Sequence, residues 1–168
     1  MHKQRRFCPQ HRLWLFLFPR IFLRGFFIRG KQMQLTLIKN TDLSVGLAYR
    51  IARVVYAQTG AITLPLVESI TSVIKNISNK TGAEYSDIIR DKNIFDVLDK
   101  KSKNHSRLFT ESTNRGFQMC VRVAQRMLSN GLCDRTFGST MFHSADTIPQ
   151  WAIARGYIAD IDGYLFYL

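Results

Sequence analysis

Residues 134–152, DRTFGSTMFHSADTIPQWA, gather side chains that could recognise or act on a polar ligand. His143 carries an imidazole that can exchange a proton near neutral pH, and Trp151 offers a broad apolar ring face. Short hydroxyl side chains that can donate or accept hydrogen bonds surround them: Thr136, Ser139, Thr140, Ser144 and Thr147. Two interpretations are open, a surface connection or the wall of a binding cleft.

Several other kinds of chemistry lack their usual sequence pattern. The four histidines, His2, His11, His105 and His143, do not show the spacing of metal ligands. The three cysteines form no CxxC pair, which argues against a zinc site and against a disulfide scaffold. Neither a nucleophile elbow nor a phosphate-binding glycine loop is present. We therefore expect no metal and no cofactor.

The net charge of +12 is distributed unevenly along the 168 residues. Residues 1–31 carry eight Lys and Arg and no acid, which is a charge of +8. The rest of the chain carries 16 bases and 12 acids, which is a net charge of only +4. A mildly basic body without a recognition motif does not indicate a nucleic-acid-binding protein, so no nucleic acid partner is expected. Nucleic-acid binding through the basic residues 1–31 stays open only as an alternative.

The first forty residues include the very apolar stretch RLWLFLFPRIFLRGFFIRG (12–30), which Arg and Pro interrupt. Because of these interruptions the stretch fits neither a membrane-spanning helix, which needs about 20 nearly uncharged residues, nor a regular signal peptide, which needs about 7–15 apolar residues in one run. Three interpretations stay open: a segment along an anionic membrane surface, a translated extension with Met33 as the true start, or an irregular signal peptide. We expect residues 1–40 to be separate from a domain of residues 41–168.

The body opens with a predicted amphipathic helix that Thr41 or Asp42 caps and that Gly60 ends. Its side chains recur at spacings of four, four, three and four, the period of one helix face: Leu43, Leu47, Ile51, Val54 and Gln58. Gln58 is therefore expected on the buried face, at the end of the helix.

Further helices are predicted from Pro65 to the NKTG stretch, over a short segment at 85–89, and from Arg115 to a left-handed cap at Gly131. The last of these helices has Cys120 in its apolar pattern, where a buried free thiol is expected. Residues 99–114 are polar with little periodicity, which predicts a surface loop.

Strands are predicted near the C-terminus, over 140–144 and within 157–167, with a turn at Asp162-Gly163. Together these elements predict an α+β fold, a mainly helical body closed by a small antiparallel sheet.

Four stretches in this order resemble one family: ARVVYAQTGA (52–61), VESITSVIKNI (67–77), DRTFGSTMFHSADTIPQWA (134–152) and YIADIDGYLFY (157–167). They are similar to the bacterial cell wall hydrolases of the spore-cortex-lytic type. That family has a Tyr-Gly-Glu-Ala-like helix end, a Val-Glu-Ala pattern leading to an Asn, an Asp-Pro-Thr-Gly-Gly-Ala-Thr-x-x-His stretch followed by Pro-Trp-Ala, and a Gly-His-x-Phe-Tyr strand. The resemblance covers about residues 43–167.

The resemblance implies a lysozyme-like or lytic-transglycosylase-like helical domain with a small sheet beside a groove. It implies cleavage of peptidoglycan glycan strands in the cell envelope, most simply by lytic transglycosylation, and it does not exclude amidase activity. The family's key acid is the Glu that ends the first helix, and Gln58 stands at that position. An amide has no acidic proton to donate to the leaving oxygen, which a glycosidase requires.

Three accounts of Gln58 stay open. The protein is a catalytically inactive peptidoglycan-binding protein, or an enzyme in which another carboxylate such as Glu68 substitutes, or an enzyme with a rearranged mechanism or a sequence error at this codon. The resemblance implies that the remaining site residues contact the glycan: Tyr56, Thr136, Gly138, Thr140, His143, Trp151 and Tyr164.

Overall fold

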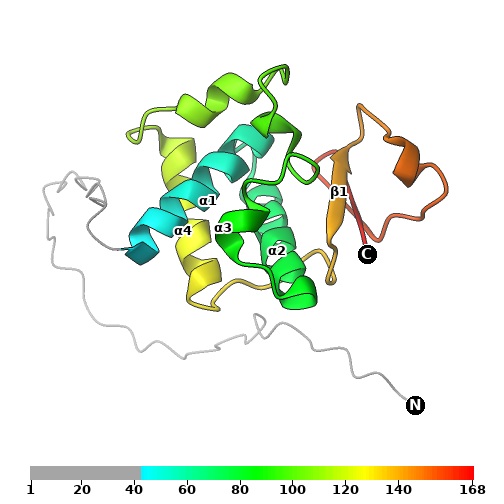
Figure 1. The fold of residues 1–168 in the computed structure, drawn as a ribbon, viewed down its shortest axis with the longest axis horizontal. Helices are drawn as coiled ribbons and strands as arrows, with labels where there is room; N and C mark the ends of the chain where they lie inside the picture. Colours follow the sequence, from blue (N-terminus) through cyan, green and yellow to red (C-terminus); the bar gives the residue numbers. More distant parts are fainter. Residues whose placement is uncertain (1–42) are drawn as a thin grey trace, which may run out of the picture. The chain divides into compact units, whose positions relative to one another are not determined.

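The structure, a computed structural model, describes residues 43–168, and helices make up about half of this part of the chain (Figure 1). A three-stranded antiparallel sheet follows them, so the predicted α+β class is confirmed. The expectations for residues 1–40, and the cap at Thr41 or Asp42, lie outside the described residues. Among the helices of residues 43–168, none is long and apolar enough to cross a membrane.

The first two helices are α1 (Leu43–Thr59) and α2 (Leu64–Thr81), and both lie close to the predicted bounds. At the start of α2 the Thr63 hydroxyl accepts a hydrogen bond from the Leu66 amide, and a proline occupies the first turn, where its missing N–H is not needed. Gly82 ends α2 with a φ of 73°, in the left-handed region that glycine adopts without strain.

The middle of the chain has shorter elements: α3 (Tyr85–Ile88) and the 3₁₀ helices η1 (Asp96–Leu98) and η2 (His105–Phe109). Helix α4 (Arg115–Leu128) begins where Asn114 accepts a hydrogen bond from the Phe117 amide, at 3.0 Å. The predicted left-handed cap at Gly131 is wrong by one position, because Asn130 adopts the positive φ of 58°. The Gly131 amide then donates to the Arg126 carbonyl at 2.7 Å, which completes a Schellman motif.

The sheet contains β1 (Met141–Ser144), β2 (Ala159–Ile161) and β3 (Tyr164–Tyr167), in the order β1-β3-β2. Asp162 and Gly163 both have positive φ, 52° and 76°, so they form the tight turn between β2 and β3 that the sequence predicts. A long excursion between β1 and β2 contains the 3₁₀ helix η3 (Gln150–Ala152). In Figure 1 this excursion projects beyond the sheet, away from the helices.

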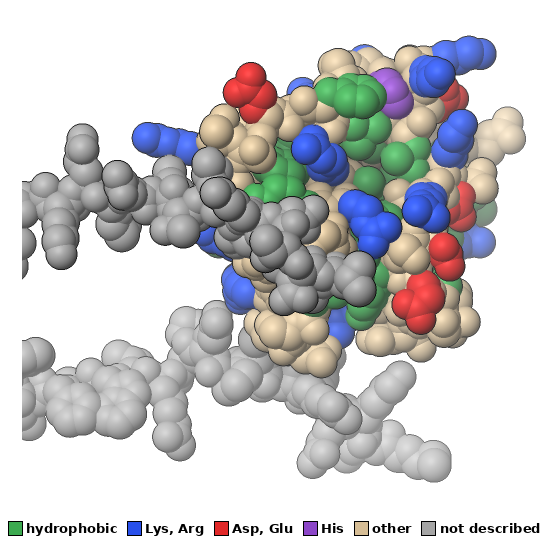
Figure 2. All heavy atoms as spheres, turned by 60° about the vertical axis from the view of Figure 1, so that its left-hand side comes forward, with side chains coloured by type: hydrophobic (Ala, Val, Ile, Leu, Met, Phe, Trp, Pro, Cys, Tyr) green, Lys and Arg blue, Asp and Glu red, His purple; other side chains and the backbone are tan. Residues whose placement is uncertain are grey.

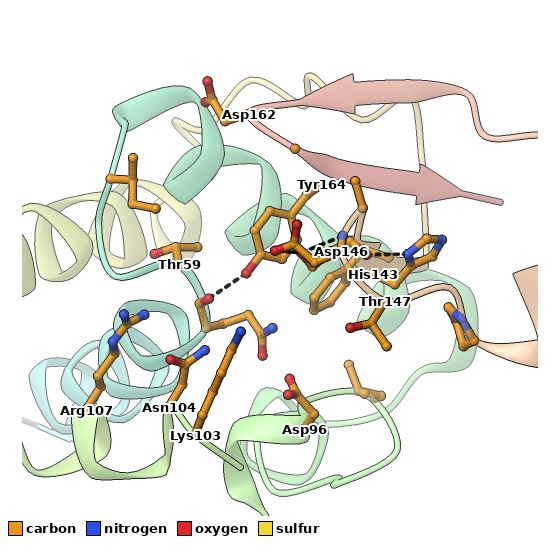
Figure 3. Close-up of a pocket in the computed structure, with 18 of the residues that line it drawn as sticks. Thr59, Asp96, Lys103, Asn104, Arg107, His143, Asp146, Thr147, Asp162 and Tyr164 are labelled. Carbon is orange, nitrogen blue, oxygen red and sulfur yellow. Dashed lines mark hydrogen bonds between the residues drawn. The ribbon is translucent and has the colours of Figure 1, made fainter.

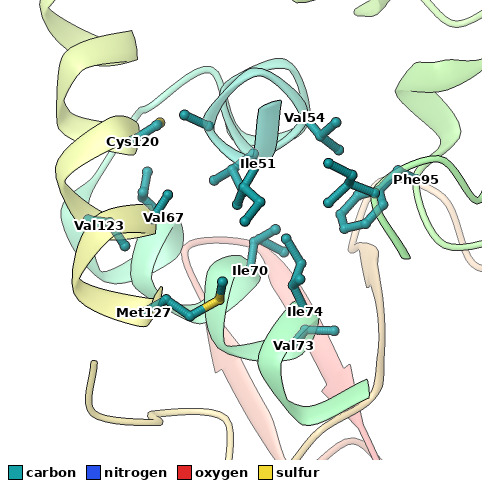
Figure 4. Close-up of a cluster of buried hydrophobic side chains, with 14 of the residues drawn as sticks. Ile51, Val54, Val67, Ile70, Val73, Ile74, Phe95, Cys120, Val123 and Met127 are labelled. Carbon is teal, nitrogen blue, oxygen red and sulfur yellow. The ribbon is translucent and has the colours of Figure 1, made fainter. Parts of the chain in front are cut away.

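The core lies where α1, α2 and α4 meet, and Phe95 and the sheet close one side of it (Figure 4). Each helix contributes its apolar stripe, for example Ile51 from α1 and Ile70 from α2. Cys120 of α4 is a buried free thiol, as predicted. Burial raises the pKa of the Cys120 thiol from 9.0 to about 12, because the thiolate would lose its hydration.

The surface carries charge of both signs. Figure 2 shows Lys and Arg side chains spread over one face, with Asp and Glu side chains among them. This mixture fits the small net charge of the body and forms no single basic stripe on the face shown.

Candidate functional site

A pocket of about 670 Å³ opens at the end of α1, and three segments line it (Figure 3). The first segment is the α1 end, with Gln58, Thr59 and Ile62. The second is the polar region 92–107, which includes η1 and the start of η2. The third consists of residues 142–151 with the β2–β3 turn and Tyr164. The volume of the pocket lies in the range of small-molecule sites.

Gln58 is a buried polar residue at the α1 end that lines the pocket. Only 7% of it is exposed, and its Oε1 atom is buried without a hydrogen-bond partner among the described residues. The amide ends up there because Gln58 continues the buried stripe of α1, as its spacing predicts. The helix stops one residue later, where Gly60 and Ala61 take positive φ values of 62° and 53°.

Tyr164 joins the sheet to α1 beside this amide. Its hydroxyl donates to the backbone carbonyl of Gln58 at 2.8 Å, across 106 residues of sequence (Figure 3). Burial raises the pKa of Tyr164, and an interaction with the side-chain amide of Gln58 opposes this in part. The hydroxyl therefore stays protonated and remains a donor. Thr63 makes a second link, because its hydroxyl donates to the carboxylate of Asp162 in the β2–β3 turn.

His143 and Trp151 form the aromatic side of the pocket, and both pack against the buried Tyr167, which does not line it. The His143 ring stacks on Tyr167 with centroids 5.4 Å apart, and Trp151 meets both rings edge to face, at 5.6 and 5.2 Å. Nδ1 of His143 lies 2.8 Å from the Ser144 carbonyl and Nε2 lies 2.9 Å from the Tyr167 hydroxyl. A carbonyl can only accept, so Nδ1 carries a proton; in the neutral ring Nε2 then accepts from Tyr167. Both nitrogens are engaged, so His143 offers the pocket a ring surface rather than a free base.

The polar region 92–107 was missed as a site by the sequence reasoning, which predicted only a surface loop over 99–114. Asp96, Lys103, Asn104 and Arg107 come from this region and lie across the pocket from His143 and Tyr164 (Figure 3). The Arg107 guanidinium lies over Gly60: a Cβ there would come within 3.0 Å of its Nη1. The alternation of Lys, Asn and Arg in 100–107 was the available signal, but it is also typical of solvated loops.

Thr136, Gly138 and Thr140 are not among the residues that line the pocket. Asp134 holds their segment in a tight turn, and its carboxylate accepts from the amide and hydroxyl of Thr136 and from the Gly138 amide, at 2.6–2.7 Å. Asn76 of α2 donates to Asp134 at 3.2 Å, to Thr136 at 3.3 Å and to the Ser139 carbonyl at 3.1 Å. These residues position the start of β1 behind the pocket.

Glu68 also lies away from the pocket lining. It is 6% exposed and forms ion pairs with Arg126 of α4 at 2.8 Å and with Arg135 at 3.1 Å. The carboxylate therefore ties α2 to α4 and to the turn that follows, and it has no route to a ligand in the pocket. Tyr56 is likewise outside the lining; its ring packs edge to face on Phe117 of α4, with centroids 6.2 Å apart.

Comparison with known proteins identifies no relative. No family model, curated protein or solved structure matches this chain. The chemical reading of the pocket therefore rests on its own geometry.

The pocket is suited to bind a neutral or weakly charged polar molecule with ring faces. Amides, hydroxyls and carboxylates can exchange hydrogen bonds with hydroxyl groups, and the partly exposed Trp151 offers a surface for an apolar ring face. Within residues 43–168, no group of three His, Cys, Asp or Glu side chains is placed to hold a metal ion.

Proposed function

We propose that the pocket binds the glycan strands of peptidoglycan and that the natural chain does not cleave them. The observation that carries this proposal is Gln58, which lines the pocket and whose buried Oε1 atom has no hydrogen-bond partner among the described residues. A sugar hydroxyl or acetamido N–H is a donor that would satisfy this oxygen, and Trp151 would stack on a pyranose ring.

The absence of cleavage follows from the carboxyl groups at the pocket. Breaking a glycosidic bond needs a protonated acid, and burial is what raises the pKa of a carboxyl far enough to supply one at neutral pH. The three carboxyl groups that line the pocket, Asp96, Asp146 and Asp162, are all exposed. The buried Glu68 is paired with two arginines elsewhere.

The positions of the four family-like stretches support the same proposal. Residues from 52–61, 134–152 and 157–167 line the pocket, and Asn76 from 67–77 anchors the 134–140 turn. A helix end facing a small sheet across a groove is what a lysozyme-like domain of this family would have. We accordingly propose that fold type and an envelope location for the domain.

The test uses purified full-length protein and insoluble peptidoglycan. We expect the natural chain to sediment with peptidoglycan, and mass spectrometry to detect no new anhydro, reducing or freed peptide ends. Gln58→Glu is nearly the same shape and restores one ionisable proton, so it should release soluble glycan fragments. General acid catalysis typically contributes 10²–10⁴-fold, and the rate should fall as the pH rises through the pKa of the new carboxyl, because only the protonated form donates.

Two outcomes would overturn the proposal. Failure of the natural chain to bind peptidoglycan or its glycan fragments would remove the ligand. Cleavage by the natural chain would show that an acid other than residue 58 acts, and Glu68→Gln in the same background would test that residue directly.

A further inference from the structure

The three cationic side chains of the pocket all come from one wall, the region 92–107: Lys92, Lys103 and Arg107. None of them forms an ion pair with a carboxylate within the described part of the chain, where the salt bridges are those of Glu68. None donates a side-chain hydrogen bond to a described residue either. Their charges are therefore available to a ligand.

The carboxylates of the pocket are already engaged by neighbouring hydroxyls, or lie on the opposite side. Asp162 lies in the β2–β3 turn and Asp146 follows β1, so both carboxylates are on the sheet side. Asp162 accepts a hydrogen bond from Thr63, and Asp146 lies 3.3 Å from the Ser144 hydroxyl. Asp96 shares the cationic wall and lies 3.4 Å from the Ser102 hydroxyl. The pocket thus has a basic side with one acid and an acidic side next to the sheet.

Arg107 extends the basic side of the pocket to the end of α1, where Gln58 also lines it. Its guanidinium lies against Gly60, two residues beyond Gln58, in the space that a side chain at position 60 would occupy. Lys103 is four residues before Arg107 and points into the pocket beside Asn104 (Figure 3). Gln58, Lys103 and Arg107 line the same pocket, so a ligand that fills it would meet both cations as well as Gln58.

We infer that the pocket selects acidic glycans, and that Lys103 and Arg107 bind a carboxylate attached to the sugar beside Gln58. This inference rests on the proposed glycan binding and adds a requirement for charge. In a peptidoglycan strand the matching group is the free lactyl carboxylate of a muramic acid residue that carries no peptide. Charge-assisted hydrogen bonds to a guanidinium or ammonium group are about twice as strong as neutral ones.

The test measures the dissociation constants of three soluble tetrasaccharides by calorimetry with the full-length protein. One alternates N-acetylglucosamine with N-acetylmuramic acid carrying free carboxylates, one is the same compound with those carboxylates converted to methylamides, and one is the neutral N-acetylglucosamine tetramer. We expect the acidic compound to bind about tenfold more tightly than either neutral one, and the preference to weaken as salt is added.

Lys103→Gln and Arg107→Gln should each remove most of this preference, measured as the ratio of the dissociation constants of the neutral and acidic compounds. Lys101→Gln is the matched control, since Lys101 is exposed in the same loop and does not line the pocket. Equal binding of all three compounds would overturn the charge requirement and leave glycan binding intact. Binding of none would overturn the proposed function and this inference with it. A preference that survives both substitutions would overturn the assignment to Lys103 and Arg107.

Discussion

The Oε1 atom of Gln58 is a single atom whose burial lowers the stability of the fold. A buried polar atom without a partner costs about 1–3 kcal/mol, because it gives up its hydrogen bonds to water. The Oε1 atom of Gln58 is in that position among the described residues. A ligand donor that pairs with it would recover this cost on binding.

Replacing this amide with an apolar side chain of similar size should therefore separate stability from binding. We expect Gln58→Leu to leave the free energy of unfolding unchanged or to raise it by about 1 kcal/mol, while weakening glycan binding at least tenfold. Urea unfolding and calorimetry measure the two quantities. The control is Gln118→Leu: Gln118 is also buried, but its amide donates to the Ser112 carbonyl at 2.6 Å, so its loss should destabilise the fold.

At the residue scale, the burial of some side chains could be predicted from the sequence and that of others could not. Helical spacing was enough to predict that Gln58 is buried at the helix end, because one amphipathic face fixes that direction. It could not show that Thr136 turns inward, since the contacts of that residue depend on Asn76, sixty residues earlier in the chain.

Among the elements, α2 has the role of holding the 134–140 turn in place. The Asn76 side chain donates to three oxygen atoms in this turn, and those oxygens belong to the connection between α4 and β1. We expect Asn76→Ala to lower the free energy of unfolding by about 1–3 kcal/mol, since it removes these bonds and leaves the acceptors short of a donor. Asn79→Ala, an exposed position on the same helix, should change it by less than about 0.5 kcal/mol.

In helix α4, the buried thiol of Cys120 should make the stability of the fold depend on pH. Its thiol pKa is about 12 in the folded chain and 9.0 ordinarily, so between these values the unfolded chain binds fewer protons than the folded one. The contribution of the Cys120 thiol to the free energy of unfolding is thus fully present below pH 9 and is lost as the pH rises toward 12. Chemical denaturation at pH 8 and pH 10.5 should show the decrease. Alkylation mapped to Cys120 by mass spectrometry at pH 8 should require unfolding, and rapid alkylation of the native chain would contradict its burial.

Element boundaries followed the sequence where a local signal existed. Periodicity predicted α1, α2 and α4, Pro65 marked the start of α2, and the Asp-Gly pair predicted the β2–β3 turn. The loop over 99–114 has no such periodicity, so its role as a pocket wall could not be predicted. That role depends on where α1 ends and on the packing of η2 against α1.

At the scale of the whole molecule, two parts of the chain differ in net charge. Residues 1–31 carry eight bases and no acid, whereas the rest has a net charge of only +4. We expect deletion of residues 1–31 to leave the melting temperature nearly unchanged and to lower binding to anionic lipid vesicles, because each basic residue near such a surface contributes about 1 kcal/mol. Calorimetric melting and vesicle sedimentation measure the two effects. A large fall in melting temperature would contradict the separation.

The hydrogen bonds from Tyr164 to Gln58 and from Thr63 to Asp162 also bear on the order of events during folding. Their partners are 106 and 99 residues apart, so the pocket closes only after a long loop has been closed, whereas α1 and α2 form from neighbouring residues. Closing a loop of that length costs several kcal/mol of chain entropy before any of these contacts forms. Local helices form faster than such distant pairings. A refolding chain should therefore regain its helical signal before it regains a binding site, and a newly made chain passes through a helical form that has no pocket.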